Sequence, residues 1–106
     1  MRIDILTLFP NIINTYINES IILRAQKENK VEINSVNYRD YSSDKHKKVD
    51  DYPYGGGKGM LIGIEPIYNA LESLKTEETK VILMSPQGNP FNHDKALSLS
   101  KEKHLV

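Results

Sequence analysis

The residues best suited to chemistry form one short stretch, VDDYPYGGGKGM, from Val49 to Met60. Four of the five positions from 55 to 59 are glycine, which loses more backbone entropy on ordering than any other residue and packs no side chain. The stretch therefore predicts a loop whose bare amides can bind an anion, a base edge or the main chain of a partner. Asp50 and Asp51 precede the glycines and are candidate acid–base groups.

The spacing of the glycines excludes two common nucleotide-binding motifs. A phosphate-binding G-x-x-x-x-G-K-[ST] loop would need Gly at position 52 and Ser or Thr at position 59, where the chain has Tyr52 and Gly59. A dinucleotide-binding G-x-G-x-x-G starting at position 55 fails at Met60. A flexible linker remains an alternative, although glycine-rich linkers usually carry Ser and lack aromatic residues and paired acids.

Composition narrows the class of protein. The 106 residues are enough for one domain with a core, and 39% apolar with 26% charged residues is ordinary for a globular protein. Lys and Arg equal Asp and Glu at 14 each, so affinity for nucleic acid would have to come from local patches. Cysteine is absent, a signal peptide is not apparent and no apolar run approaches a membrane span, so we predict a cytoplasmic protein.

Strand-like and helix-like stretches alternate along the chain, which predicts an α/β fold. Pro10 suits the first turn of a helix, Ser20 is a candidate cap of a second helix, and Asn92 or Asp94 is a candidate cap of the last one. The expected strands are 2–9, 31–36, 80–84 and the start of one at 103–106; the expected helices are 10–17, 20–28, 64–74 and 95–100.

A polar segment from 37 to 59 separates the two halves of this pattern. Residues 37–48 offer nothing for a core in this interpretation, and 45–48 form the basic run KHKK. Taken alone, such a run is as often a solvated surface loop as a site. Together with the glycine stretch it is long for a compact domain, and long loops are usually functional or disordered.

A second candidate site follows the expected strand at 80–84. In a parallel α/β sheet, ligands bind at loops that leave the carboxyl ends of the strands. Pro86 biases Ser85 to an extended conformation, and Gly88 lets the chain turn with its amides exposed. A plain strand-to-helix turn is the alternative.

The chain ends soon after the expected strand at 103–106 begins. Because a strand usually runs to about five residues and needs neighbours, we expect residues 1–106 to be the N-terminal part of a single domain within a longer polypeptide.

The motifs together resemble one family, the bacterial tRNA (guanine-N1)-methyltransferases. They extend over nearly the whole chain, and the string Asp-Asp-x-Pro-Tyr-Gly-Gly-Gly-x-Gly-Met is highly specific. The chain differs from the family just before Arg24, where glycine is common. The motifs that carry the resemblance are Leu8-Phe9-Pro10, Arg24-Ala25, Arg39-Asp40, Lys45-His46, Val49-Asp50-Asp51, Pro53 to Met60, Pro66 and Ser85-Pro86-Gln87-Gly88.

The resemblance implies a SPOUT-class α/β methyltransferase with a mostly parallel sheet and helices on both faces. Its trefoil knot would lie largely beyond residue 106, as would a C-terminal helical domain. Such an enzyme transfers the methyl group of S-adenosylmethionine to N1 of the guanosine 3′-adjacent to the tRNA anticodon. It works as a homodimer whose active site is shared between subunits.

The resemblance also implies roles for individual residues. One side of the cofactor pocket would be lined by Leu83, Met84, Ser85, Pro86, Gln87 and Gly88. The tRNA or its target base would be contacted by Arg24, Lys45, His46, Asp51, Gly55, Gly56, Gly57 and Gly59. Asp50 is the catalytic candidate within the chain, although the aspartate usually assigned as the base lies beyond it.

Two further expectations follow. Because half of the implied pocket lies outside residues 1–106, we expect these residues alone to be catalytically inactive. The histidines at 46, 93 and 104 lack the spacing of a zinc site, so no metal site is predicted. The main competing hypothesis is a small α/β RNA-binding module that uses the basic run and no cofactor.

Overall fold

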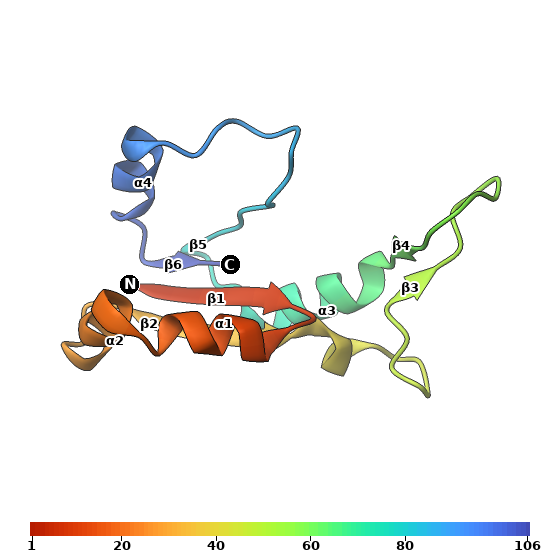
Figure 1. The fold of residues 1–106 in the computed structure, drawn as a ribbon, viewed down its shortest axis with the longest axis horizontal. Coiled ribbons are helices and arrows are strands. Elements are labelled where there is room, and N and C mark those ends of the chain that lie inside the picture. Colours follow the sequence, from red (N-terminus) through yellow and green to blue (C-terminus); the bar gives the residue numbers. More distant parts are fainter.

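A computed structural model describes all of residues 1–106, and it contains a four-stranded parallel sheet in the order β2-β1-β6-β5 (Figure 1). A separate antiparallel pair, β3 and β4, stands outside this sheet. The predicted α/β fold with a mostly parallel sheet is confirmed. The strands are β1 (Arg2–Thr7), β2 (Glu32–Asn37), β3 (Asp50–Asp51), β4 (Leu61–Ile62), β5 (Thr79–Lys80) and β6 (His104–Leu105).

The first half of the chain forms the longest strand pair. β1 and β2 run in register from Arg2 opposite Glu32 to Thr7 opposite Asn37. Two predicted helices, α1 (Pro10–Ile17) and α2 (Ser20–Lys27), make the connection. The capping role expected for Ser20 is wrong. The Leu23 amide donates to the Glu19 carbonyl, so the N-cap residue of α2 is Glu19, and no side chain caps the helix.

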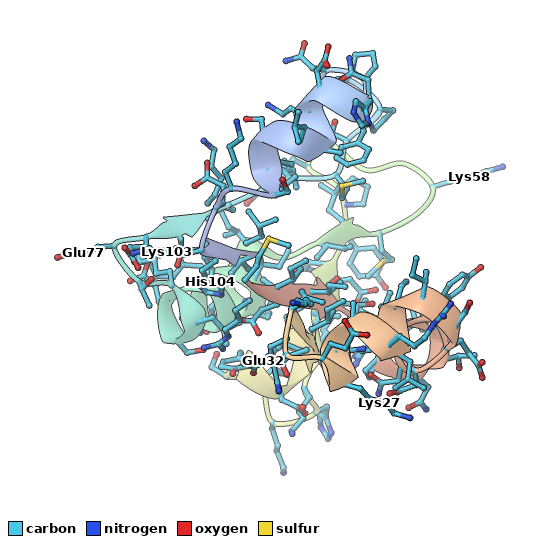
Figure 2. All side chains as sticks on the ribbon, turned by 90° about the vertical axis from the view of Figure 1, so that its left-hand side faces the viewer. Lys27, Glu32, Lys58, Glu77, Lys103 and His104 are labelled. Atoms are coloured by element: carbon cyan, nitrogen blue, oxygen red, sulfur yellow. The ribbon has the colours of Figure 1, made fainter.

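The second half contains the other two helices, α3 (Ile64–Leu74) and α4 (His93–Leu99). Both agree with prediction, and the Asn92 side chain caps α4 by accepting a 2.9 Å hydrogen bond from the Lys95 amide. The ribbon in Figure 2 places α3 on one face of the sheet and α1 with α2 on the other. None of the helices is long and apolar enough to cross a membrane.

The core lies where η1, a 3₁₀ turn at Tyr38–Tyr41, meets α3. Tyr38, Val49 and Ala70 are buried there, with side chains of β1 and α3 packed around them. The expectation that residues 37–48 contribute nothing to a core is therefore wrong. Tyr38 is the first residue after β2 and begins the 3₁₀ turn, and its side chain is buried although the residues that follow it in the sequence are polar.

The expected strand at 80–84 is also largely wrong. Only Thr79 and Lys80 pair as β5, and a last ladder bond runs from the Ile82 amide to the Val106 carbonyl at 2.8 Å. Beyond this point Leu83 and Met84 make no backbone hydrogen bond to a neighbouring strand, and both are exposed. Apolar character alone does not make a strand when no neighbouring backbone accepts its hydrogen bonds.

Replacement of Val49 by alanine tests the buried core. Val49 is 3% exposed, and we expect Val49→Ala to lower the free energy of unfolding by about 2 kcal/mol through lost burial and a cavity. Val81→Ala is the matched control, because Val81 is 54% exposed and its loss should stay within about 0.5 kcal/mol. Urea unfolding with an unchanged m value measures both; equal effects would contradict this core.

Candidate functional site

The glycine stretch forms the loop of a hairpin that projects from the body of the molecule (Figure 1). β3 and β4 pair Asp50 with Ile62 and Asp51 with Leu61, and the Gly63 amide donates to the Val49 carbonyl at 2.7 Å. This short ladder closes the loop at its base. The intervening residues 52–60 form no strand or helix, as predicted.

Glycine is required in this loop by the backbone conformation. Gly55 and Gly56 have φ of 81° and 80°, and Gly57 has φ of 124°. The Gly56 amide donates to the Pro53 carbonyl at 3.1 Å, so Gly55 occupies the turn position that needs a positive φ. A Cβ built at these glycines or at Gly59 meets no atom within 4 Å. The space beside these backbones is therefore open to a ligand.

The side chains of the hairpin point into solvent. Tyr54 is 100% exposed and Tyr52 76% exposed, and Figure 2 shows Lys58 extending away from the rest of the molecule. Exposed aromatic rings next to open backbone can stack on bases of single-stranded nucleic acid.

Asp50 and Asp51, at the base of the hairpin, have different surroundings. Asp51 accepts a 2.8 Å hydrogen bond from the Tyr52 amide and pairs with Lys48 Nζ at 3.3 Å. The amide bond, aided by Lys48, holds the pKa of the Asp51 carboxyl below its usual value. The half-buried Asp50 makes no side-chain hydrogen bond or ion pair within the chain, so its carboxylate is available to a ligand.

The basic run is held in place by Asp44, which the sequence analysis missed. Its carboxylate accepts hydrogen bonds from the amides of His46 at 2.8 Å and Lys48 at 3.0 Å. These bonds, that of Lys48 first, lower the pKa of the Asp44 carboxyl. The sequence signal was an Asp two residues before His46, a spacing at which aspartate commonly bonds the backbone of a turn.

Further bonds fasten this loop to η1 and to Ser42, the residue that follows η1. The Ser42 hydroxyl donates to the Lys48 carbonyl at 2.6 Å, and Arg39 Nη1 donates to the Lys47 carbonyl at 3.1 Å. Lys47 Nζ also pairs with Asp40 at 3.1 Å. The backbone and Lys47 are thus engaged within the chain, while Lys45 and His46 have exposed side chains without hydrogen bonds or ion pairs.

A small pocket of about 270 Å³ joins these features. Asp44, Lys48, Asp50 and Asp51 all line it, together with the start of α3. Pockets for drug-sized ligands usually occupy about 300–1,000 Å³, so this one fits a small group or part of a larger ligand. No three of the acidic or histidine side chains are arranged to hold a metal ion.

The second candidate site is the turn that follows residues 81–84. The Gly88 amide donates to the Ser85 carbonyl at 3.2 Å, and the Gln87 amide donates to the Ser85 hydroxyl at 3.2 Å, which confirms the predicted turn. Leu83 and Met84 are 86% and 85% exposed beside it. Two apolar side chains and a polar turn are thus open to solvent.

The structure separates the predicted site residues into three places. The acids of the 270 Å³ pocket adjoin the basic run and the hairpin, whereas residues 83–88 lie in a different part of the molecule (Figure 1). Arg24 is exposed on α2, at the opposite end from the hairpin. A larger hollow of about 600 Å³ beside Met1 and Arg2 contains none of these residues and lies at the amino end of β1, away from the edge where α/β sheets bind ligands.

Removal of the Asp44 carboxylate should loosen the basic run. We expect Asp44→Ala to speed hydrogen exchange at the His46 and Lys48 amides, while Asp44→Asn keeps an acceptor oxygen and much of the protection. Because the pKa of Asp44 is lowered, both bonds are present above the ordinary carboxyl pKa and are lost as pH falls through the lowered value. NMR exchange rates across this titration measure the effect; equal rates in Asp44→Ala and the unaltered chain would contradict it.

Comparisons with known proteins show which proteins the chain is similar to. The chain is 58% identical over its whole length to a tRNA (guanine-N(1)-)-methyltransferase from Staphylococcus aureus strain JH9, and equally to that of strain Newman. It spans 44% of the length of each of these relatives. The crystal structure of a tRNA (m1G37) methyltransferase from Aquifex aeolicus superposes with a TM-score of 0.83 and 33% identity, over 99% of this chain and 48% of that one.

A family profile extends the match to every residue. The profile described as tRNA (Guanine-1)-methyltransferase TrmD covers residues 1–106. The chain therefore belongs to the tRNA (guanine-1)-methyltransferase family.

Proposed function

We propose that this protein, as part of its full-length polypeptide, transfers a methyl group from S-adenosylmethionine to N1 of the guanosine 3′-adjacent to a tRNA anticodon. The observation that carries the proposal is the hairpin at 52–60, where positive-φ glycines leave backbone open beside the Asp50–Asp51 pair. This combination occurs in a chain that belongs to the tRNA (guanine-1)-methyltransferase family. The cytoplasm, where tRNA is found, is the corresponding location.

The hairpin and the basic run supply the tRNA side of the site. Lys45 and His46 project from a loop whose backbone is fixed by Asp44, so the charge of Lys45 and the hydrogen-bonding groups of His46 face solvent at little ordering cost. Phosphate contacts of this kind position a nucleic acid, and base contacts then select the target. The open amides of 55–59 and the exposed rings of Tyr52 and Tyr54 suit a base that has left its stack.

Methylation at N1 requires removal of the proton that this ring nitrogen carries in guanine. A carboxylate within hydrogen-bond reach can accept it. Asp50 is the candidate within this chain, because its side chain has no internal partner and lines the pocket at the base of the hairpin. Asp51 is already engaged by the Tyr52 amide and Lys48, and its role is to hold the hairpin base and the basic run together.

The turn at 85–88 is the candidate cofactor site. Its residues fit an adenosine-containing ligand, because Leu83 and Met84 offer exposed apolar surface and the turn offers backbone polar groups. It follows β5, at the strand end where α/β sheets bind ligands. When bound, S-adenosylmethionine supplies an electrophilic methyl group; the residues of this chain would hold its adenosine and methionine parts.

A homodimer accounts for the distance between the two sites. The hairpin and the turn at 85–88 lie apart within one chain (Figure 1), and a base held by the hairpin must meet the methyl donor. In a symmetric pair, the hairpin of one subunit can face the turn of the other. Exposed apolar side chains around the hairpin support such an interface, among them Met60, Leu61, Ile62, Ile64 and Tyr68.

The first experiment uses the full open reading frame and two tRNA transcripts that differ only in carrying G or A next to the anticodon. We expect methyl incorporation from S-adenosylmethionine into the G transcript alone, and binding of S-adenosylhomocysteine by titration calorimetry. Gly57→Ala should reduce the methylation rate at least about tenfold, because φ of 124° is strained for any residue with a Cβ. RNA binding without cofactor binding would favour an RNA-binding module and reject the proposal.

The second experiment reverses one charge of the basic run. Lys45→Glu should weaken tRNA binding about tenfold at low salt and reduce the slope of log affinity against log salt by about one, since a phosphate contact is lost. Lys95→Glu is the matched control, because α4 lies far from the basic run (Figure 1). Filter binding over a salt series measures both variants; equal losses would show that the basic run has no special part in binding.

A further inference from the structure

A row of polar side chains crosses the four-stranded sheet, with one residue from each of its strands. Asp4 of β1 accepts hydrogen bonds from Asn34 of β2 at 2.9 Å and from His104 Nε2 of β6 at 2.8 Å. The other ring nitrogen, His104 Nδ1, lies 2.6 Å from the Thr79 hydroxyl of β5. These four residues, the cross-sheet row, follow the strand order β2-β1-β6-β5.

The row is buried at its centre. Asp4 is 1% and His104 6% exposed, and Arg2 forms an additional 2.8 Å ion pair with Asp4. Burial alone raises the pKa of Asp4, but the hydrogen bonds from Asn34, His104 and Arg2 outweigh it and the pKa lies below its usual value. Asp4 is therefore an acceptor-only carboxylate, and His104 Nε2 must carry the proton that it donates.

At the β5 end of the row, both His104 Nδ1 and the Thr79 hydroxyl have hydrogen-bond partners. With the Nε2 proton donated to Asp4, the other ring nitrogen, Nδ1, is the partner of the Thr79 hydroxyl. The Thr79 oxygen in turn accepts from the Thr76 amide at 2.7 Å. The row thus links β1 to the turn that begins β5, through the buried side chain of His104.

Backbone hydrogen bonds also attach β5 and β6 to the sheet. Each of their ladders with a neighbouring strand is two residues long. In addition, the Arg2 amide donates to the Lys103 carbonyl at 2.8 Å, the Val106 amide to the Lys80 carbonyl at 3.1 Å and the Ile82 amide to the Val106 carbonyl at 2.8 Å. A slip of β6 by one residue would turn its side chains to the opposite face of the sheet. The Asp4–His104 bond survives only in the observed register.

The position of the turn at 85–88, the candidate cofactor site, depends on how β5 is attached to the sheet. After Ile82, no backbone hydrogen bond holds the chain until Gly88 donates to Ser85 within the turn itself. The last fixed points before Leu83 are therefore the Thr79 side chain and the Ile82 amide. A displacement of β5 would therefore also displace residues 83–88.

We propose that Asp4, His104 and Thr79 are positioning residues, which fasten β6 and β5 to β1 and thereby set the place of the turn at 85–88. The proposal rests on the function proposed above in one respect, that the turn binds the methyl donor. None of the three residues touches the donor in this proposal. Their effect reaches it through β5, whereas the basic run at 45–48 attaches to η1 through Arg39 and to β3 through Asp51 and is independent of them.

The experiment compares three variants of the full-length protein. Thr79→Val removes the hydroxyl but keeps the shape, Thr79→Ser keeps the hydroxyl, and Thr15→Val removes a hydroxyl that bonds only within α1, to the Asn11 carbonyl. We expect Thr79→Val to weaken S-adenosylhomocysteine binding about tenfold, because His104 Nδ1 loses its partner in a buried site. Binding of tRNA should stay within about twofold, and Thr79→Ser and Thr15→Val should behave as the unaltered protein.

Hydrogen exchange separates failure of this proposal from failure of the proposed function. Thr79→Val should speed exchange about tenfold at the Ile82 and Val106 amides, which a lost anchor would expose. Unchanged exchange there, or equal losses of cofactor and tRNA affinity, would overturn the positioning role. If the unaltered protein bound no S-adenosylhomocysteine, the proposed function and the cofactor part of this inference would both fail, while the exchange rates would still decide the anchoring.

Discussion

The buried carboxylate of Asp4 constrains the whole sheet. Removal of a carboxylate from water costs several kcal/mol unless hydrogen bonds and an opposite charge compensate. Here the compensating groups come from β1 itself, β2 and β6, so the charge is stable only when three strands are assembled in one register. Apolar packing is nondirectional and does not by itself select one register of the strands. The directional bonds to Asp4 favour one register.

The two candidate sites are held in place by different interactions. The hairpin and the basic run are shaped locally, by glycines at positive φ and by Asp44 bonding to nearby amides. Their geometry therefore needs little from the remainder of the fold beyond the core around Val49. The turn at 85–88 is shaped locally too, but its place depends on β5 and hence on contacts with residues about 100 positions apart in the chain, Asp4 and His104. Mutations should affect the two sites separately.

The sequence predicted the helices well because their signals are local. Apolar spacing, Pro10 in a first turn and the Asn92 cap depend on residues within a few positions of one another. The prediction failed where the outcome depends on distant partners. Tyr38 is buried because α3 packs over it, and Leu83 and Met84 form no strand because their backbone has no hydrogen-bond partner, although their own sequence favours a strand.

The sequence by itself determined that residues 52–60 form a loop, since glycines in such density can adopt little else, and it placed the acids, the basic run and the turn at 85–88 in chain order. Only the tertiary structure decided that Asp44, Asp50 and Asp51 share one pocket and that the hairpin and the turn stand apart. It also decided that Asp4 and His104 meet. These outcomes depend on strand order and on packing between distant segments, and the energy of a buried charge is defined only once its neighbours are assembled.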